Sequence, residues 1–252
     1  MSVAIDFAAA TDVGLKRRNN EDSHAVLAGL DQQSYVVILA DGMGGHQKGE
    51  LASSLAVRYV RERLSQEIRP EMDSAQIRRI LEAVVEKANV KVYLESLADR
   101  SRWEMGTTLT TAVIRGSKLI IGHIGDCRCY VLRAGQFLQL TVDHTLVQVL
   151  VDRGEMKAEE ARRHPRKNEV MRALGSPEFV KADMIEARLE PGDRLLFCSD
   201  GLHDYVEEGA IQQCLAQAET PKAACWNLIS LANSTAGQDN VTCVVGFVHQ
   251  VS

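Results

Sequence analysis

Residues 36–46 read VVILADGMGGH, an apolar run that ends at Asp41 and is followed at once by glycines. A short apolar run rich in β-branched residues is typical of a buried strand. The glycines let the chain turn sharply and approach other backbone closely. An aspartate beside a glycine at a strand end is most often a turn residue, so Asp41 alone indicates no function.

Four more aspartates stand in similar places. Asp126 follows LIIGHIG, Asp200 follows RLLFCS, Asp239 precedes VTCVVGFV, and Asp22 closes RRNNED. Strand ends at one rim of a sandwich can converge. At about 4 Å and an effective dielectric near 20, each pair of like charges would cost on the order of 4 kcal/mol, so such a cluster needs cations or protons. Ligands that are all oxygen favour Mg²⁺ or Mn²⁺ over zinc, and the Gly42 carbonyl could join them.

The remaining pattern predicts a layered α+β sandwich, because strands, a helical block, more strands and a second helical block alternate along the chain. Strands are expected at Val3–Ala10, Tyr35–Ala40, Thr107–Ile114, Lys118–Ile124, Cys127–Arg133, Phe137–Thr141, Asp183–Leu189, Arg194–Ser199 and Asn240–Val248, the middle four as an antiparallel meander. Helices are expected at Gly49–Leu64, Ser74–Leu97, capped by Asp73 or Ser74, and Glu207–Ala218, with one more after Thr220-Pro221. No linker or repeat interrupts the 252 residues, which favours one domain, 1–252.

Composition excludes several classes of protein. Hydrophobic residues make up 45% and charged residues 25%, with a formal net charge of -5, so a sizeable core is expected and a nucleic-acid binder is disfavoured. No apolar run reaches the roughly 18 residues of a membrane span, and the N-terminus does not resemble a signal peptide. The six cysteines form no CxxC pair, which indicates reduced thiols and a cytoplasmic protein.

Eight motifs in order resemble the type 2C serine/threonine phosphatases, the metal-dependent protein phosphatase family. They are TDVGLKRRNNEDS, VILADGMGGHQKGELAS, GTTLTTAVI, IGHIGDCRCYVL, LTVDHTLV, HPRKNEVMRALG, LEPGDRLLFCSDGLHD and GQDNVTCVV. The resemblance covers almost the whole chain, from about Asp12 to Val248, and the compact form is similar to a bacterial stand-alone catalytic domain.

The resemblance implies a four-layer α/β/β/α sandwich, with two central antiparallel sheets flanked by helices, and a site for two Mn²⁺ or Mg²⁺ ions; bacterial members often hold a third. Asp41 would bridge both ions, and Asp200 and Asp239 would complete the coordination shell of the first ion. Gly42 and Glu21 would serve the second ion, directly or through water. Asp22 would orient metal-bound waters, and Asp126 with Asp200 would hold the third ion.

The implied reaction is hydrolysis of phosphoserine and phosphothreonine by a metal-bridging hydroxide. Arg17 stands where the family places its phosphate-binding arginine, with Arg18 as the alternative, and His46 where it has a proposed general acid. Taken singly, Arg17 is one member of a basic run on a turn and His46 a loop histidine. The implied partners are phosphorylated proteins, including a serine/threonine kinase and its substrates; a monomer is expected.

The polar segment 144–177 corresponds to the family's flap, either a solvated loop or a lid over the site. Three positions depart from the family pattern: Cys127 replaces a small hydroxyl residue, His203 replaces Thr, and Gln47-Lys48 replaces a more glycine-rich stretch. His203 could alter substrate binding or proton transfer. Two other functions stay open at this point: a regulatory module that binds a phosphorylated partner without turnover, and a phosphatase of small phosphoesters.

Overall fold

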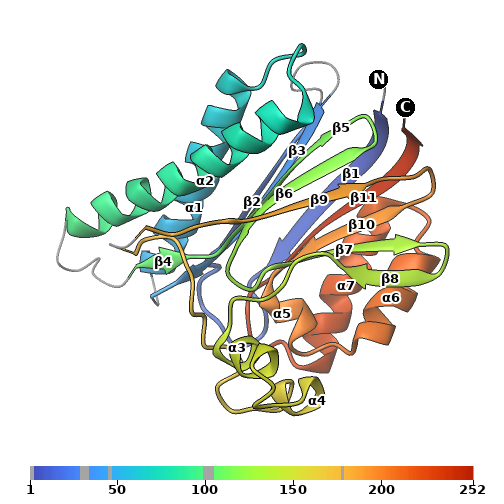
Figure 1. Cartoon of the computed structure of the whole chain (residues 1–252). Helices are drawn as coiled ribbons and strands as arrows, with labels where there is room; N and C mark the ends of the chain where they lie inside the picture. Colours follow the sequence, from blue (N-terminus) through green and yellow to red (C-terminus); the bar gives the residue numbers. More distant parts are fainter. Residues whose placement is uncertain (1–2, 29–33, 45–46, 99–104, 177–178, 252) are drawn as a thin grey trace.

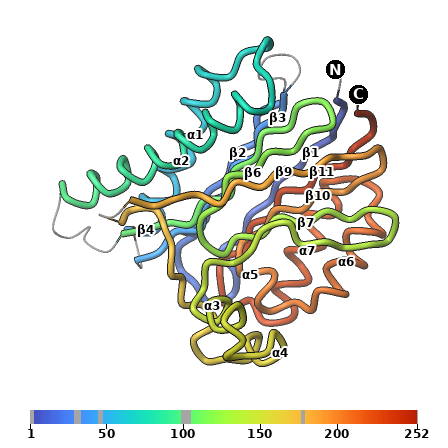
Figure 2. Tube along the Cα trace, viewed as in Figure 1, coloured from blue at the N-terminus to red at the C-terminus, as the bar shows by residue number. Residues whose placement is uncertain are grey.

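Two antiparallel sheets lie face to face between two layers of helices in the computed structural model (Figure 1). The structure describes residues 3–28, 34–44, 47–98, 105–176 and 179–251. The four-layer α+β sandwich that the sequence predicts is therefore the fold of the chain. The tube in Figure 2 shows that the first and last strands run side by side, which brings both ends of the chain to the same part of the molecule.

The first sheet contains the two ends of the chain. Its strand order is β1 (Val3–Asp12), β11 (Val241–Val251), β10 (Arg194–Cys198), β7 (Arg128–Arg133) and β8 (Gln136–Gln139). All neighbouring strands are antiparallel, and Cys198 pairs with Cys243 where β10 meets β11. The strand β10 thus ends directly before Ser199 and Asp200, close to the start of β11, which Asp239 precedes.

The second sheet contains the sequence around Asp41. Its order is β2 (Asp22–Leu27), β3 (Ser34–Met43), β5 (Leu109–Arg115), β6 (Lys118–Ile124) and β9 (Asp183–Arg188), and β4 (Gly106–Thr107) pairs with the end of β3. In the register of β2 and β3, Asp22 lies directly opposite Asp41. Every residue of β5 is buried, because this strand lies in the middle of the sheet.

Three hydrophobic clusters correspond to the three interfaces between the four layers. One joins the second sheet to α1 (Gln47–Glu67) and α2 (Ser74–Leu97), and another joins the first sheet to α6 (Glu208–Gln217) and α7 (Pro221–Thr235). The third, which contains Leu39, Ile121 and Phe197, fills the space between the sheets. Each sheet is therefore apolar on both faces, as its near-continuous apolar runs require.

Local sequence signals explain where two of the helices begin. The Asp73 side chain accepts a hydrogen bond from the Gln76 backbone amide at 2.8 Å, and the Gln76 side-chain oxygen accepts one from the Asp73 backbone amide at 2.9 Å. This capping box satisfies two backbone donors that a helix start would otherwise leave free. Thr220 caps α7, with Pro221 in its first turn. Both starts were predicted.

Three features differ from the sequence-based expectation. The middle strands do not form one meander, because β5 and β6 lie in one sheet and β7 and β8 in the other. The chain crosses over at Gly125, whose φ of 106° is a conformation that L-residues rarely adopt. The strand β2 and the single helical turn α5 (Asp200–His203) were not predicted at all.

The segment expected to be a flap contains α3 (Leu146–Asp152) and α4 (Ala158–Ala161), followed by irregular chain. Figure 1 shows these two short helices at one end of the sandwich, below α5. Isolated bridges, Thr145 with Val170 and Thr107 with Leu174, hold the base of the segment. Among the described residues, no helix combines the length and the apolar character that a bilayer-spanning segment needs.

Phe197 tests the packing between the sheets, because its side chain is fully buried there. We expect Phe197→Ala to lower the free energy of unfolding by about 3–5 kcal/mol, since it removes a large side chain and leaves a cavity. Urea unfolding measures the change. The matched control is Phe179→Ala, whose ring is 74% exposed and whose loss should change stability by no more than about 0.5 kcal/mol. Equal losses for both variants would contradict this description of the core.

Candidate metal centre

The backbone around Asp41 is held by two threonines. The Asp41 amide donates to Thr108 Oγ1 at 2.9 Å, and the Asp41 carbonyl accepts from the Thr108 amide and from Thr107 Oγ1, each at 2.8 Å. Both threonines belong to the motif GTTLTTAVI, to which the sequence alone assigned no role. They fix the direction of the Asp41 side chain through its main chain.

Glycines 42 and 49 allow a very close approach of three chain segments. A Cβ added to Gly42 would overlap the Gly49 carbonyl, and a Cβ added to Gly49 would overlap Glu21 Oε2. The same added atom on Gly49 would lie 2.8 Å from the Gly42 carbonyl oxygen. Glu21 and the Gly42 carbonyl, two of the ligands that the resemblance implies, therefore lie beside one another in a space that a larger residue would fill.

Asp22 lies in the interior, with 9% of its surface exposed. Its Oδ2 atom accepts hydrogen bonds from Ser199 Oγ at 2.7 Å and from Thr242 Oγ1 at 2.6 Å. Its Oδ1 atom is buried and has no hydrogen-bond partner. One oxygen thus anchors the side chain to the other sheet, and the second is left available to a ligand or a water.

Asp200 and Asp239 are brought together by a close contact between α5 and the start of β11. A Cβ added to Gly201 would overlap the Asn240 carbonyl, so only glycine permits this approach. Asn240 also fixes the N-terminal loop: its Oδ1 accepts from the Glu21 amide at 2.8 Å, and its Nδ2 donates to two carbonyls of that loop. Asn240 therefore braces the N-terminal loop against the start of β11.

Arg17 points toward the aspartates and not into bulk solvent. Its Nη2 donates to Asp239 Oδ2 at 2.7 Å, although 53% of the Arg17 side chain is exposed. This hydrogen bond raises the pKa of Arg17, and the charges of Asp239, Glu21 and Asp200 add to it despite the opposing effect of burial. A guanidinium at the open edge of an acidic site can present its remaining donors to a phosphate.

Asp126 sits on the turn that carries the chain from β6 to β7 and is only 5% exposed. Burial raises its pKa to about 7, and the charges of Asp143 and Asp204 add to the effect. Around it, Arg128 forms a bidentate ion pair with Asp143, whose shorter distance is 2.6 Å. Neither Asp143 nor Asp204 was singled out by the sequence, because an isolated aspartate gives no signal of its partners.

The aspartates raise one another's pKa. Burial is the main reason why the pKa values of Asp41 and Asp200 lie well above the ordinary range of a carboxyl. For Asp41 the further causes are the charges of Asp22, Asp200, Asp126 and Asp239, so all five groups lie within electrostatic reach. Burial also raises the pKa of Asp22 to about 6 against its two hydroxyl hydrogen bonds. Such mutual repulsion is relieved by protons or by cations.

The residues present fit a divalent metal centre. The donors are all oxygen, Asp22 Oδ1 has no partner, and the Glu21 side chain and the Gly42 carbonyl share a space kept open by glycine. Within the described ranges no three His, Cys, Asp or Glu side chains form a coordination shell by themselves. Backbone oxygen and water would have to complete each shell, which is the usual manner of Mg²⁺ and Mn²⁺ in proteins.

Of the site residues expected from the sequence, Glu21, Asp22, Asp41, Gly42, Asp126, Asp200, Asp239 and Arg17 lie in one connected region. His46 lies outside the described residues. The hydroxyl groups of Ser199 and Thr242 that hold Asp22 were not expected; both lie inside motifs that carry the family resemblance, LEPGDRLLFCSDGLHD and GQDNVTCVV, which was the available signal. Cys127 is buried between the sheets.

A four-layer sandwich with this cluster of carboxylates defines a metal-dependent phosphatase, and comparison with known proteins agrees. The profile of the family described as Protein phosphatase 2C matches residues 16–224. The serine/threonine phosphatase stp of Listeria innocua is 37% identical over 235 residues, which cover 93% of this chain and 92% of the relative. The chain belongs to the protein phosphatase 2C family.

Two solved structures show the same fold. Stp1 of Staphylococcus aureus, a serine/threonine phosphatase, matches with a TM-score of 0.92 at 31% identity, covering 98% of this chain and 96% of that one. The catalytic domain of the phosphatase PstP in complex with two manganese ions matches with a TM-score of 0.84 at 37% identity, covering 99% and 100%. Both matches confirm the fold class and the family resemblance.

Gly49 tests the close approach at the candidate centre. We expect Gly49→Ala to weaken Mn²⁺ binding by about 10-fold or more, because the new Cβ displaces Glu21 from the Gly42 carbonyl. Titration calorimetry measures the affinity. Gly209→Ala is the matched control, since it is also a helical glycine but a Cβ there meets no atom within 4 Å. Similar Mn²⁺ affinities in the two variants would show that the approach does not matter.

Proposed function

We propose that this chain hydrolyses phosphoserine and phosphothreonine in proteins, with Mn²⁺ or Mg²⁺ as cofactor. The observation that carries the proposal is a group of five aspartates from separate segments of the chain. Asp41 is one of them, and the other four lie within electrostatic reach of it. The family membership and the names of the relatives, which are serine/threonine phosphatases, support it. PstP, with its two manganese ions, supports the choice of metal.

The proposed residue roles are those that the family resemblance implies, and the positions of the side chains support them. Asp41 would contact both ions, Asp200 and Asp239 would complete one shell, and Gly42 with Glu21 would serve the other. Asp22, anchored through Oδ2, would direct Oδ1 to a water, and Asp126 with Asp200 would hold a third ion. When bound, such ions lower the pKa of a water so that it attacks phosphorus near neutral pH.

Two further residues would act on the phosphate group. Arg17 is held by Asp239 through one Nη atom, so the rest of its planar guanidinium can donate to phosphoryl oxygens and stabilise their charge. His46 would protonate the leaving alkoxide. Because water is the nucleophile in this scheme, no cysteine is required, and all six cysteines are free thiols, five of them buried.

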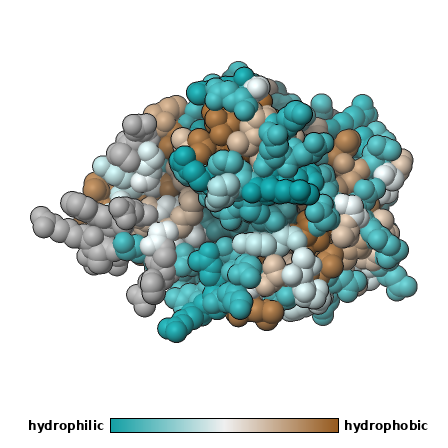
Figure 3. Space-filling model, turned by 90° about the horizontal axis from the view of Figure 1, so that it is seen from below, coloured by the Kyte–Doolittle hydropathy of each residue, from teal (hydrophilic) through white to brown (hydrophobic). Residues whose placement is uncertain are grey.

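The setting of the site is also a proposal. We expect residues 1–252 to act as one catalytic domain, in the cytoplasm and as a monomer, opposing a serine/threonine kinase, with 144–177 as a lid that contacts substrates. Figure 3 shows the molecule from below, toward the end where α3 and α4 lie; its surface is mainly hydrophilic, with small separate apolar areas. A polar phosphorylated segment suits such a surface better than an apolar ligand does.

Asp200 provides the direct test of this function. We expect Asp200→Ala to reduce Mn²⁺-dependent turnover of a phosphothreonine peptide by at least about 100-fold, because the site loses a metal ligand. Asp6→Ala, on the exposed edge of β1, is the control and should leave turnover unchanged. Turnover that survives in Asp200→Ala would refute the proposed centre. Faster hydrolysis of a sugar phosphate than of the peptide would identify a small-molecule phosphatase instead.

Arg17 is tested against its neighbour. We expect Arg17→Ala to raise KM for the phosphopeptide by about 10-fold, because a bidentate donor to the phosphate is lost. Arg18→Ala should stay within about twofold of the parent, since of these two arginines it is Arg17 that donates to Asp239. Steady-state kinetics separates KM from kcat. If Arg18→Ala gave the larger rise in KM, the phosphate-binding role would belong to Arg18.

A further inference from the structure

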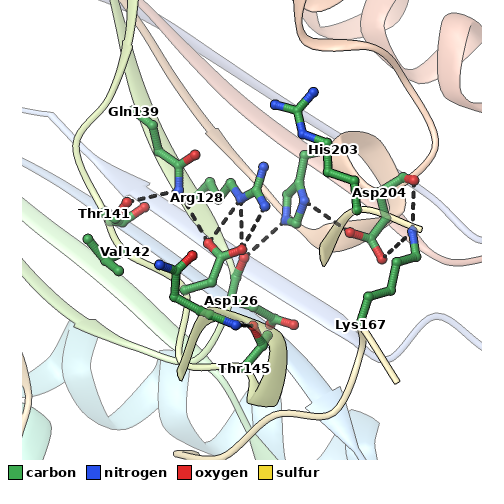
Figure 4. Close-up of polar contacts among 12 residues, drawn as sticks. Asp126, Arg128, Gln139, Thr141, Val142, Thr145, Lys167, His203 and Asp204 are labelled. Atoms are coloured by element: carbon green, nitrogen blue, oxygen red, sulfur yellow. Dashed lines mark hydrogen bonds and ion pairs between the residues drawn. The ribbon is translucent and has the colours of Figure 1, made fainter. Parts of the chain in front are cut away.

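His203 is a buried donor to the turn that carries Asp126. Its side chain is 2% exposed, and its Nε2 lies 3.0 Å from the Asp126 carbonyl oxygen (Figure 4). A carbonyl only accepts hydrogen bonds, so Nε2 must carry the hydrogen and donate. The other ring nitrogen, Nδ1, faces Asp204 Oδ1 at 3.4 Å. Both nitrogens are directed at the protein, so the ring is not placed to meet a substrate.

Three successive carbonyls of this turn are held by three different parts of the fold. The Gly125 carbonyl accepts from the His144 amide at 2.8 Å, and the Cys127 carbonyl accepts from Thr110 Oγ1 at 3.2 Å. Between them, the Asp126 carbonyl accepts from His203. Only this third bond comes from α5, the helical turn that also begins with Asp200. It therefore joins the backbones of two carboxylates that come from different chain segments.

The next residue, Asp204, connects α5 to the segment 144–177. Lys167 Nζ, from that segment, lies 3.1 Å from Asp204 Oδ2 and donates to the Asp204 carbonyl at 2.9 Å. The Lys167 ammonium also lies 5.2 Å from the centre of the Tyr205 ring. The ion pair is largely shielded, with exposed fractions of 25% and 15%, so it is screened less than a surface pair. The neighbouring pair Arg162–Glu208 is far more exposed.

We propose that His203 is a positioning residue that fixes the distance between Asp126 and Asp200, and that Lys167 makes this distance depend on the docking of the segment 144–177. The inference rests on the proposed function, because it concerns an ion held between these two aspartates. His203 orients the turn through its main chain, as outer residues around a metal orient the direct ligands. Lys167 orients α5 from the other side, through Asp204.

The first test counts and measures Mn²⁺ binding by calorimetry and by electron paramagnetic resonance. The variant Asp126→Asn should lose the binding of one Mn²⁺ ion, and this loss identifies the binding event to which Asp126 contributes. We expect His203→Ala to weaken this same event by about 10-fold and to leave the others unchanged. His203→Gln should stay within about threefold of the parent, because the glutamine Nε2 can donate from nearly the same place.

The second test concerns the segment 144–177. We expect Lys167→Met to weaken the same Mn²⁺ event by a smaller factor, about threefold, because one partly buried ion pair is lost. The control is Arg162→Met, which removes a different ion pair between this segment and the body of the protein, that with Glu208. Its Mn²⁺ binding should match the parent. Thermal unfolding of each variant shows whether it is folded.

Each outcome decides a separate claim. A parent protein that binds no Mn²⁺ refutes the proposed function and this inference with it. If the parent binds Mn²⁺, the proposed function stands, and two results would refute this inference alone. One is an Asp126→Asn variant that keeps every Mn²⁺ binding event, and the other is a His203→Ala variant that changes all of these events or none. Failure of His203→Gln to restore binding shows that the donated hydrogen bond is not the cause. Equal effects of Lys167→Met and Arg162→Met refute the role of Lys167.

Discussion

Repulsion among buried carboxylates is the constraint on which the rest of this structure depends. Asp41 is buried and within reach of the charges of four other aspartates, so its ionised form is strongly disfavoured without a counter-charge. Side-chain hydrogen bonds nevertheless hold these groups together, through Thr108 at Asp41, Asn240 at the N-terminal loop, and Ser199 with Thr242 at Asp22. Folding brings these carboxylates together, so their repulsion destabilises the folded state. A cation that binds between them removes this repulsion and therefore stabilises the folded state.

The sandwich explains how carboxylates far apart in sequence meet. Asp22 and Asp41 come from one sheet, whereas Asp200 and Asp239 stand beside strands of the other. Asp126 lies on the connection that crosses between them, after a glycine with positive φ. Two packed sheets whose strands end at the same rim give a rigid support on both sides of a site, with each side chain set by a different strand.

The sequence predicted the architecture where local signals were strong. The apolar run before Asp41 gave β3, and Asp73 with its capping box gave the start of α2. It missed β2, an edge strand of six residues, DSHAVL, that is only partly buried and lacks a clear period. It also gave no means to see that β6 and β7 lie in different sheets, or that His203 reaches the Asp126 carbonyl, because both depend on contacts between distant segments.

Charge balance around Asp126 explains why a histidine at position 203 suits this chain. Asp126, Asp143, Asp200 and Asp204 stand near two cations, Arg128 and Lys167. Carboxylates outnumber cations in this region, so a divalent ion is attracted to it. A third fixed cation would weaken the attraction for that ion, whereas a neutral histidine adds a hydrogen bond without adding charge. Burial and the charge of Arg128 lower the pKa of His203 against the opposing effects of Asp204 and Asp143, which favours the neutral ring.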